Sequence, residues 1–262
     1  MTNSCLLYEQ SGPVGWITLN RPNAMNAINL QMLDEFEKLL PRLANDEAVK
    51  VVVLTGKGKA FCAGADLKEI LNSASLRPGD EDFIDRLNVR VLDVLRDFPK
   101  PVIAALNGIT MAGGLETAIC ADIVVAADSA RIGDAHANYG VYPGAGGAAV
   151  LPRIIPLNVA KFLLFTGGTL SAEEMKVYGF VNHVVGLDSL RAETQRIAEL
   201  IAEKSPIALR RMKAVANNTG DKSLRDALDH EQVLFRRHMR SYDVAEGLKA
   251  FSEKRKPKFR GY

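Results

Sequence analysis

The chain has 262 residues, a formal net charge of +2 at pH 7, and 47% hydrophobic and 24% charged residues. This composition is that of an ordinary globular protein, and the length is near the upper limit for a single hydrophobic core. The small net charge gives no electrostatic reason to expect binding to nucleic acid or to a membrane surface.

The three cysteines, Cys5, Cys62 and Cys120, are odd in number and far apart in the sequence. This pattern argues against a disulfide framework and favours a reducing compartment, so we expect a cytoplasmic protein. The first residues, MTNSCLLYEQ, lack the features of a signal peptide. No run of about 18 apolar residues predicts a membrane span, and no Cys/His cluster has the spacing of a metal site.

The first half of the chain repeats a strand, a glycine-rich turn and a helix. Apolar, β-branched segments predict strands at 14–20, 49–56, 101–108 and 121–127. Between them, Leu33, Phe36 and Leu40 mark one face of a helix, and residues 80–97 predict a second helix that ends before Pro99. The alternation predicts an α/β fold with several short sheets.

After residue 156 the sequence becomes mainly helical. Ser171 and Glu174 have the pattern of a capping box at a helix start. Two further apolar helix faces consist of Leu190, Ile197 and Ile201, and of Leu224, Leu228, Phe235 and Met239. Such faces need a partner, either the core or another subunit. The charged run EKRKPKFR at 253–260 is expected to be a solvated tail.

The segment NGITMAGGLETAICAD at 107–122 predicts a strand, a glycine turn and a short helix. Gly113 opens that helix, where N–H groups have no partner within the helix, so its N–H is a candidate donor to a developing oxyanion. Glu116 should lie near the same point because helix side chains lean towards the N-terminus. The alternative is a carboxylate that only complements the helix dipole.

The segment GKGKAFCAGADLKEI at 56–70 has the same form, with CAGAD at a predicted helix start. The N–H of Ala65 is therefore a second candidate donor, and two such groups can bind one carbonyl oxygen. The GKGK loop lacks the glycine and lysine spacing of a phosphate-binding loop, which excludes nucleotide hydrolysis.

The segments AFCAGADLKE, PKPVIAALNG, AGGLE, ADIVVAA, YPGAGG and FSEKRKPKF together resemble the enoyl-CoA hydratase/isomerase superfamily, also called the crotonase fold. The resemblance covers nearly the whole chain. It implies a spiral of ββα units in residues 1–195 and a C-terminal helical trimerisation region in residues 196–262. It also implies acyl-CoA thioester substrates, with coenzyme A as part of the substrate and no separate cofactor, and enolate formation at the N–H groups of Ala65 and Gly113.

The hydratases of this family use two glutamates. The first corresponds to Glu116, whereas the second corresponds to His136, four residues before Gly140, so this chain departs from the family pattern. Histidine can still transfer protons because its ordinary pKa of about 6.5 is close to neutral pH. The alternative is a histidine that is hydrogen-bonded to Asp134 or to a backbone carbonyl and has no chemical role.

The preferred interpretation is that a Glu/His pair adds water to a 2-enoyl-CoA thioester. Decarboxylation, C–C cleavage or thioester hydrolysis through the same enolate is the alternative; simple isomerisation is disfavoured, because the isomerases typically keep their single glutamate at the other position. A non-catalytic CoA-binding or RNA-binding homologue is a different class of protein, although basic motifs interleaved with aromatic residues are absent. Tyr139 and Tyr142 are alternative proton donors for such variant reactions, but both are expected to be packing residues.

The resemblance also implies a homotrimer or a dimer of trimers, an acyl pocket lined by residues around 70–95, and a set of residues near CoA. That set consists of Ala63, Asp66, Leu67, Lys68, Phe235, Phe251 and Lys254. In proteins of this family, the residues that correspond to Phe235, Phe251 and Lys254 often come from a neighbouring subunit. Lys57 and Lys59 are further candidates for the CoA phosphates, with exposed surface lysines as the alternative.

Overall fold

The structure is a computed structural model that describes residues 4–73 and 82–262. Within these residues, one sheet has the strand order β1–β2–β3–β5–β7–β10. Its strands are Leu6–Ser11 (β1), Val14–Leu19 (β2), Val51–Gly56 (β3), Val102–Leu106 (β5), Ile123–Ala127 (β7) and His183–Val185 (β10). Strands β1 and β2 form an antiparallel hairpin, and the other neighbouring pairs are parallel.

A second, smaller sheet has the order β4–β6–β8–β9. Its strands are Ala60–Cys62 (β4), Ile109–Met111 (β6), Arg131–Gly133 (β8) and Thr169–Ser171 (β9). The chain passes from β3 to β4 and then to α2 (Leu67–Ser73), and from β5 to β6 and then to α5 (Gly113–Ala118). Each of these units therefore places one strand in each sheet before its helix, as a spiral of ββα units requires.

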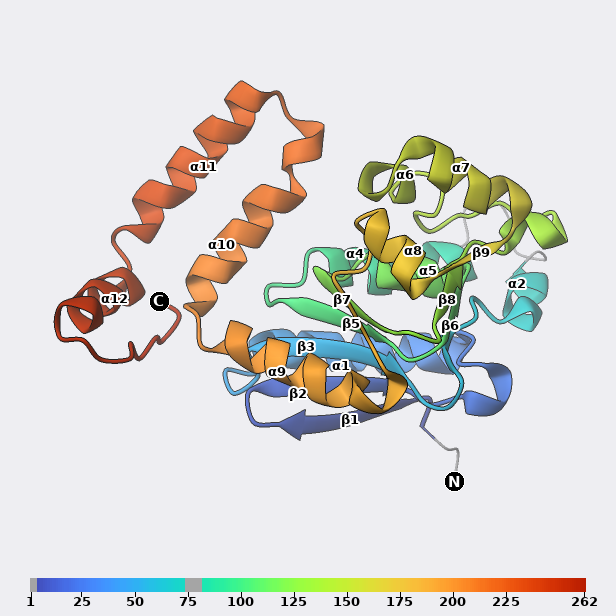
Figure 1. Cartoon of the computed structure of the whole chain (residues 1–262), viewed down its shortest axis with the longest axis horizontal. Helices are drawn as coiled ribbons and strands as arrows, with labels where there is room; N and C mark the ends of the chain where they lie inside the picture. Colours follow the sequence, from blue (N-terminus) through green and yellow to red (C-terminus); the bar gives the residue numbers. More distant parts are fainter. Residues whose placement is uncertain (1–3, 74–81) are drawn as a thin grey trace.

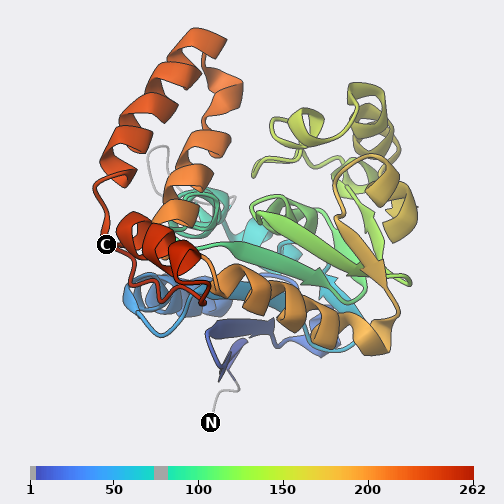
Figure 2. The same cartoon turned by 60° about the vertical axis from the view of Figure 1, so that its left-hand side comes forward.

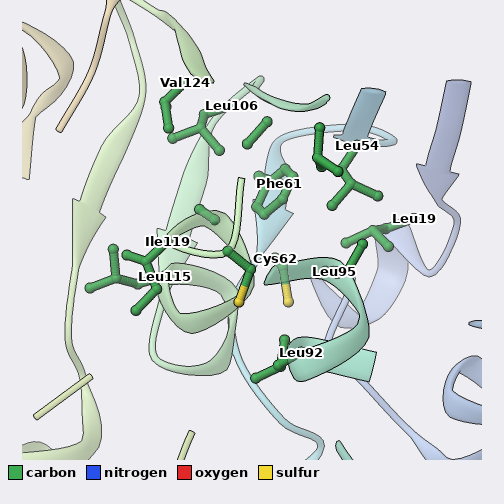
Figure 3. Close-up of a cluster of buried hydrophobic side chains, with 14 of the residues drawn as sticks. Leu19, Leu54, Phe61, Cys62, Leu92, Leu95, Leu106, Leu115, Ile119 and Val124 are labelled. Carbon is green, nitrogen blue, oxygen red and sulfur yellow. The ribbon is translucent and has the colours of Figure 1, made fainter. Parts of the chain in front are cut away.

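The central strands are buried on both faces, which explains their nearly continuous apolar sequences. Val52 and Leu54 of β3 pack into one hydrophobic layer, and Val51 and Val53 pack into another. Figure 3 shows the first layer, where side chains from the sheet meet Leu92, Leu95, Leu115 and Ile119. Helix α9 (Leu190–Ala202) covers the opposite face (Figure 1).

The predicted strands are confirmed as β2, β3, β5 and β7, with ends that differ by one or two residues. The helix predicted over 80–97 is divided: α3 (Phe83–Leu87) and α4 (Asp93–Arg96) are joined by a π-helical turn, Asn88–Leu92. Residues 80 and 81 of that prediction lie outside the described residues. The first predicted helix is α1 (Leu30–Asn45), which buries Leu33, Phe36 and Leu40.

The later part of the chain is mainly helical, as predicted. Its remaining helices are Leu151–Ile154 (α6), Leu157–Thr166 (α7), Ala172–Val177 (α8), Pro206–Asn217 (α10), Leu224–His238 (α11) and Tyr242–Ser252 (α12). The capping box of Ser171 and Glu174 is present at the start of α8. Helices α10 to α12 extend to one side of the sheets (Figures 1 and 2). None of the described helices is long and apolar enough to cross a membrane.

Two details of the C-terminal part differ from expectation. The proposed boundary between residues 195 and 196 falls within α9, whose Leu190 and Ile197 are buried against the large sheet. The charged end of the chain is exposed to solvent, as expected, but it is not free. Glu246 accepts hydrogen bonds from Arg255 and from the Lys258 N–H, and these bonds hold the tail against α12.

Candidate active site

Two strand-to-helix turns meet at one point of the structure. Ile28 forms a parallel β-bridge with Ala65: the Ile28 N–H donates to the Gly64 oxygen at 2.8 Å, and the Asp66 N–H donates to the Ile28 oxygen at 2.7 Å. Because the bonded groups belong to the residues on either side of Ala65, the N–H of Ala65 points away from the bridge. A Cβ atom on Gly113 would lie 3.2 Å from this nitrogen, so the two candidate donors are neighbours.

The Gly113 N–H takes its direction from an unusual backbone conformation. Ala112, between β6 and α5, has φ +50° and ψ −122°. A non-glycine residue in such a conformation costs about 1–3 kcal/mol and persists only where surrounding contacts hold it. Here the Ala112 N–H is bonded to the Gly133 oxygen at 3.2 Å, which ties the turn to β8.

Glu116 is buried, with 2% of its surface exposed, and its two carboxylate oxygens have different surroundings. Oε1 accepts hydrogen bonds from the N–H groups of Ala145 at 2.8 Å and Gly147 at 3.0 Å. Oε2 lies 4.0 Å from Nε2 of His136. Burial raises the pKa of Glu116 above its ordinary value, although the two N–H donors and His136 act in the opposite direction.

His136 lies in the short 3₁₀ helix His136–Tyr139 and faces two carboxylates. Its Nδ1 is 2.9 Å and 3.0 Å from the two carboxylate oxygens of Asp134, and its Nε2 faces Glu116. Burial acts to lower the pKa of His136, but the hydrogen bond and charge of Asp134 and the charge of Glu116 outweigh it, so the pKa is raised. His136 therefore contacts Asp134 with one ring nitrogen and faces Glu116 with the other.

One cavity of about 470 Å³ brings most of the predicted residues together. Its lining includes Ala63, Ala65, Asp66, Leu67, Lys68, Gly113, Glu116 and His136. Ile84 and Leu87, from the segment expected to line the acyl pocket, also contribute. The charge of Asp66 is balanced by Arg21, whose Nη2 is 2.9 Å from its Oδ2. Among the described residues of this wall, Lys68 is thus the cation that can approach a bound anion, whereas Lys57 lines a neighbouring groove.

The expectation that Tyr139 and Tyr142 are packing residues is wrong for this chain. They are 70% and 78% exposed, and both line the cavity. The backbone reverses between them at Gly140, with φ +63°, and this turn leaves both rings outside the core.

The predicted C-terminal residues do not reach the cavity within one chain. Phe235 lines a separate groove between α10 and α11, and Phe251 on α12 is 86% exposed. Figure 1 shows α12 at the opposite end of the molecule from α2, and Lys254 is the second residue after the end of α12.

Two N–H groups of the site escaped the sequence-based prediction. Ala145 and Gly147 hold Glu116, and the signal for them is the glycine-rich turn YPGAGG, which indicates the family without marking these two donors. Met25 and two neighbouring alanines also line the cavity without any motif to mark them. Within residues 4–73 and 82–262, no group of three or more His, Cys, Asp or Glu side chains is placed to hold a metal ion.

Repeated ββα units with two converging N–H groups beside a buried glutamate define a protein of the crotonase fold. The chain belongs to the enoyl-CoA hydratase/isomerase family, whose model matches residues 9–262. The membership inferred from the sequence motifs is therefore confirmed.

Individual proteins similar to this chain span nearly its whole length. The crystal structure of an enoyl-CoA hydratase from Bacillus anthracis has a TM-score of 0.92 and 36% identity, and the match covers 98% of this chain and 100% of that one. The crotonyl-CoA hydratase of Syntrophomonas wolfei is 35% identical, with 97% of both chains covered. The short-chain-enoyl-CoA hydratase of Clostridium acetobutylicum is 34% identical, with 96% of this chain and 95% of that one covered.

Proposed function

We propose that the protein adds water to the double bond of a 2-enoyl-CoA thioester and produces a 3-hydroxyacyl-CoA. The observation that carries this proposal is the facing pair of Glu116 Oε2 and His136 Nε2 in the same cavity as the N–H groups of Ala65 and Gly113. The names of the similar proteins from S. wolfei and C. acetobutylicum, both hydratases of short enoyl-CoA thioesters, support it.

The reaction begins when the thioester oxygen accepts hydrogen bonds from Ala65 and Gly113. These donors stabilise the negative charge that develops on this oxygen when a nucleophile adds to C3. Glu116 Oε2 takes a proton from a water molecule, and the resulting hydroxide oxygen bonds to C3. His136 Nε2–H then donates a proton to C2 of the enolate. A proton moves from Glu116 to His136 to restore the starting state, so one water is consumed and no other reactant is needed.

Substitution of the two proton-transfer groups tests this proposal, with crotonyl-CoA as the substrate. Glu116→Gln keeps the shape of the side chain but removes the base, so kcat should fall by about 10²–10⁴-fold while CoA thioester binding remains. His136→Ala should lower kcat more than it raises KM, and His136→Gln should not restore activity, because an amide cannot carry the proton. Full hydration of crotonyl-CoA by His136→Gln would instead show that Glu116 acts without a proton from His136.

We also propose a homotrimer or a dimer of trimers, in which Phe235, Phe251 and Lys254 contact CoA bound to a neighbouring subunit. Support comes from apolar side chains on the C-terminal helices that the single chain leaves exposed. Met212, Leu224, Leu228, Phe235, Leu248 and Phe251 are 49–86% exposed. Light scattering should show a mass about three or six times 28.5 kDa. A stable monomer would contradict the assembly.

The remaining parts of the proposal concern the substrate and its location. Ala63, Leu67 and Lys68 lie on the wall of the cavity where CoA would enter, so we assign them to CoA binding. Coenzyme A is part of the substrate, and no separate cofactor is proposed. The three buried free cysteines support a reducing compartment, and we propose the cytoplasm. Fractionation of the source cells with an antibody against the protein tests this location.

A further inference from the structure

We propose that Asp134 is a positioning residue for His136: it keeps a proton on Nδ1 and thereby makes Nε2 the nitrogen that exchanges a proton in the cavity. The kinetic consequence of this inference rests on the proposed function. Its structural consequence can be measured on the resting protein, without any substrate.

Asp134 directly follows β8 and is completely buried. Its Oδ1 accepts a hydrogen bond from the His136 backbone N–H at 3.0 Å, and both of its oxygens are within 3.0 Å of Nδ1. In the described part of the chain, every hydrogen bond to this carboxylate comes from His136. A buried carboxylate is costly unless it is paired, so the burial of Asp134 depends on the imidazole beside it.

The chemistry of the pair determines the tautomer of the imidazole. An ionised carboxylate can only accept hydrogen bonds, so the Nδ1 that faces Asp134 must carry a proton. In the neutral ring, Nε2 is therefore an acceptor, and in the charged ring it is a donor. Because Nε2 is 4.0 Å from Glu116 Oε2, too far for a direct hydrogen bond, it remains available to a substrate atom in the cavity.

The charges around the ring favour its protonated form. Asp134 faces it from the end of β8 and Glu116 from α5, while Tyr139 lies on the same short helix. Among the described residues that line the cavity, the other charged groups are Lys68 and Asp66, and Asp66 is paired with Arg21. Two nearby carboxylates oppose the effect of burial on the pKa of His136, which is raised. These charges thus favour His136 as a proton donor.

Asp134→Asn is the informative variant because asparagine has only one side-chain oxygen. If that oxygen keeps the bond to the His136 backbone N–H, the NH₂ group faces Nδ1 and donates to it. The ring then carries its proton on Nε2 when neutral, and it also loses a neighbouring negative charge. We expect kcat for crotonyl-CoA hydration to fall by about 10²-fold or more, with a smaller change in KM. The alkaline limb of the pH–rate profile should move to lower pH.

Asp243→Asn is a matched control. Asp243 is another buried carboxylate that accepts backbone N–H bonds, from Arg260 and Gly261, but it lies outside the cavity. This variant can lower the melting temperature, but it should leave the pH–rate profile of the enzyme unchanged. A shift of the profile in Asp134→Asn but not in Asp243→Asn would support a role for Asp134 through His136.

Nuclear magnetic resonance of ¹⁵N-histidine-labelled protein gives the second readout. The chain has four histidines, and the signal of His136 is assigned by its loss in His136→Gln. The wild-type ring should be protonated at Nδ1 when neutral, whereas in Asp134→Asn it should be protonated at Nε2 and have a lower pKa. An unchanged tautomer and pKa would overturn the inference and leave Asp134 as a packing group. The tautomer and pKa of His136 can change as expected in Asp134→Asn while the wild-type protein fails to hydrate enoyl-CoA thioesters. That result would support the inference and contradict the proposed function.

Discussion

The side-chain amide of Asn88 donates a hydrogen bond of 2.7 Å to the carbonyl oxygen of Gly144. The same peptide unit carries the N–H of Ala145, which donates to Oε1 of Glu116. Because the peptide unit is planar and rigid, Asn88 fixes the direction of one of the two donors that hold the carboxylate. The π-helical turn Asn88–Leu92 therefore contacts the active site through the side chain of Asn88, and the preceding Leu87 lines the cavity.

Removal of the Asn88 side-chain amide should loosen the hydrogen bond that the Ala145 N–H donates to Glu116. Asn88→Ala should cost about 1 kcal/mol of stability, and kcat should fall several-fold because Glu116 is held less firmly. Asn45→Ala is the control, since Asn45 also donates an amide hydrogen bond to a carbonyl, that of Pro41 on α1, away from the cavity. Equal kinetic constants for the two variants, measured with crotonyl-CoA, would argue against the connection.

A methyl group at Gly113 should obstruct the two backbone donors. The added Cβ would lie 3.2 Å from the Ala65 nitrogen, where the thioester oxygen is expected. Loss of one such donor typically lowers kcat by about 10²–10³-fold, and Gly113→Ala should reach that range. Gly186→Ala should retain activity, because an added Cβ there meets no atom within 4 Å and φ is −59°. Similar rates for both variants would exclude the proposed oxyanion site.

The raised pKa values of Glu116 and His136 predict how stability changes with pH. Burial is the largest cause for Glu116, and the Asp134 and Glu116 charges outweigh burial for His136. When the pKa of a group is higher in the folded protein than in the unfolded protein, the group stabilises the fold fully at pH values below its unfolded pKa. This stabilisation is lost as the pH rises through the pKa of the folded protein. The unfolded values are 4.5 for Glu116 and 6.5 for His136.

The melting temperature of the wild type relative to Glu116→Gln should therefore decrease as the pH rises above 4.5. The melting temperature of the wild type relative to His136→Gln should likewise decrease as the pH rises above 6.5. Thermal unfolding of the three proteins in matched buffers measures both differences, in which titrating groups away from Glu116, His136 and Asp134 cancel. A difference that grows with pH would show that the sign of the shift is wrong.

The three cysteines should be unreactive in the folded protein. Cys5, Cys62 and Cys120 are free and buried, and burial raises the pKa of Cys62 and of Cys120 to about 12. Because the thiolate is the reactive form, a thiol reagent at neutral pH should react slowly with native protein. The same reagent should find three thiols after denaturation without a reductant. Rapid reaction of the native protein would indicate that the core around the reacting cysteine opens readily.

Local sequence was sufficient where a structure depends on neighbouring residues. The strands β2, β3, β5 and β7 are apolar because they are buried, and the start of α5 leaves N–H groups unpaired whatever surrounds it. These features identified Gly113, Ala65 and Glu116 as candidate active-site residues. Strand β1 was missed because one of its faces is exposed, and the segment LLYEQS is correspondingly mixed in polarity.

The sequence by itself therefore determined the family, the α/β architecture and the positions of Glu116 and His136 in the chain. Only the tertiary structure decided that Ala145 and Gly147 hold one oxygen of Glu116, and that Asp134 is buried against His136. The physical reason is that Glu116 and its two backbone donors belong to segments that pack together only after the sheets have formed. A hydrogen bond between Glu116 and a residue about thirty positions away leaves no local pattern in either segment.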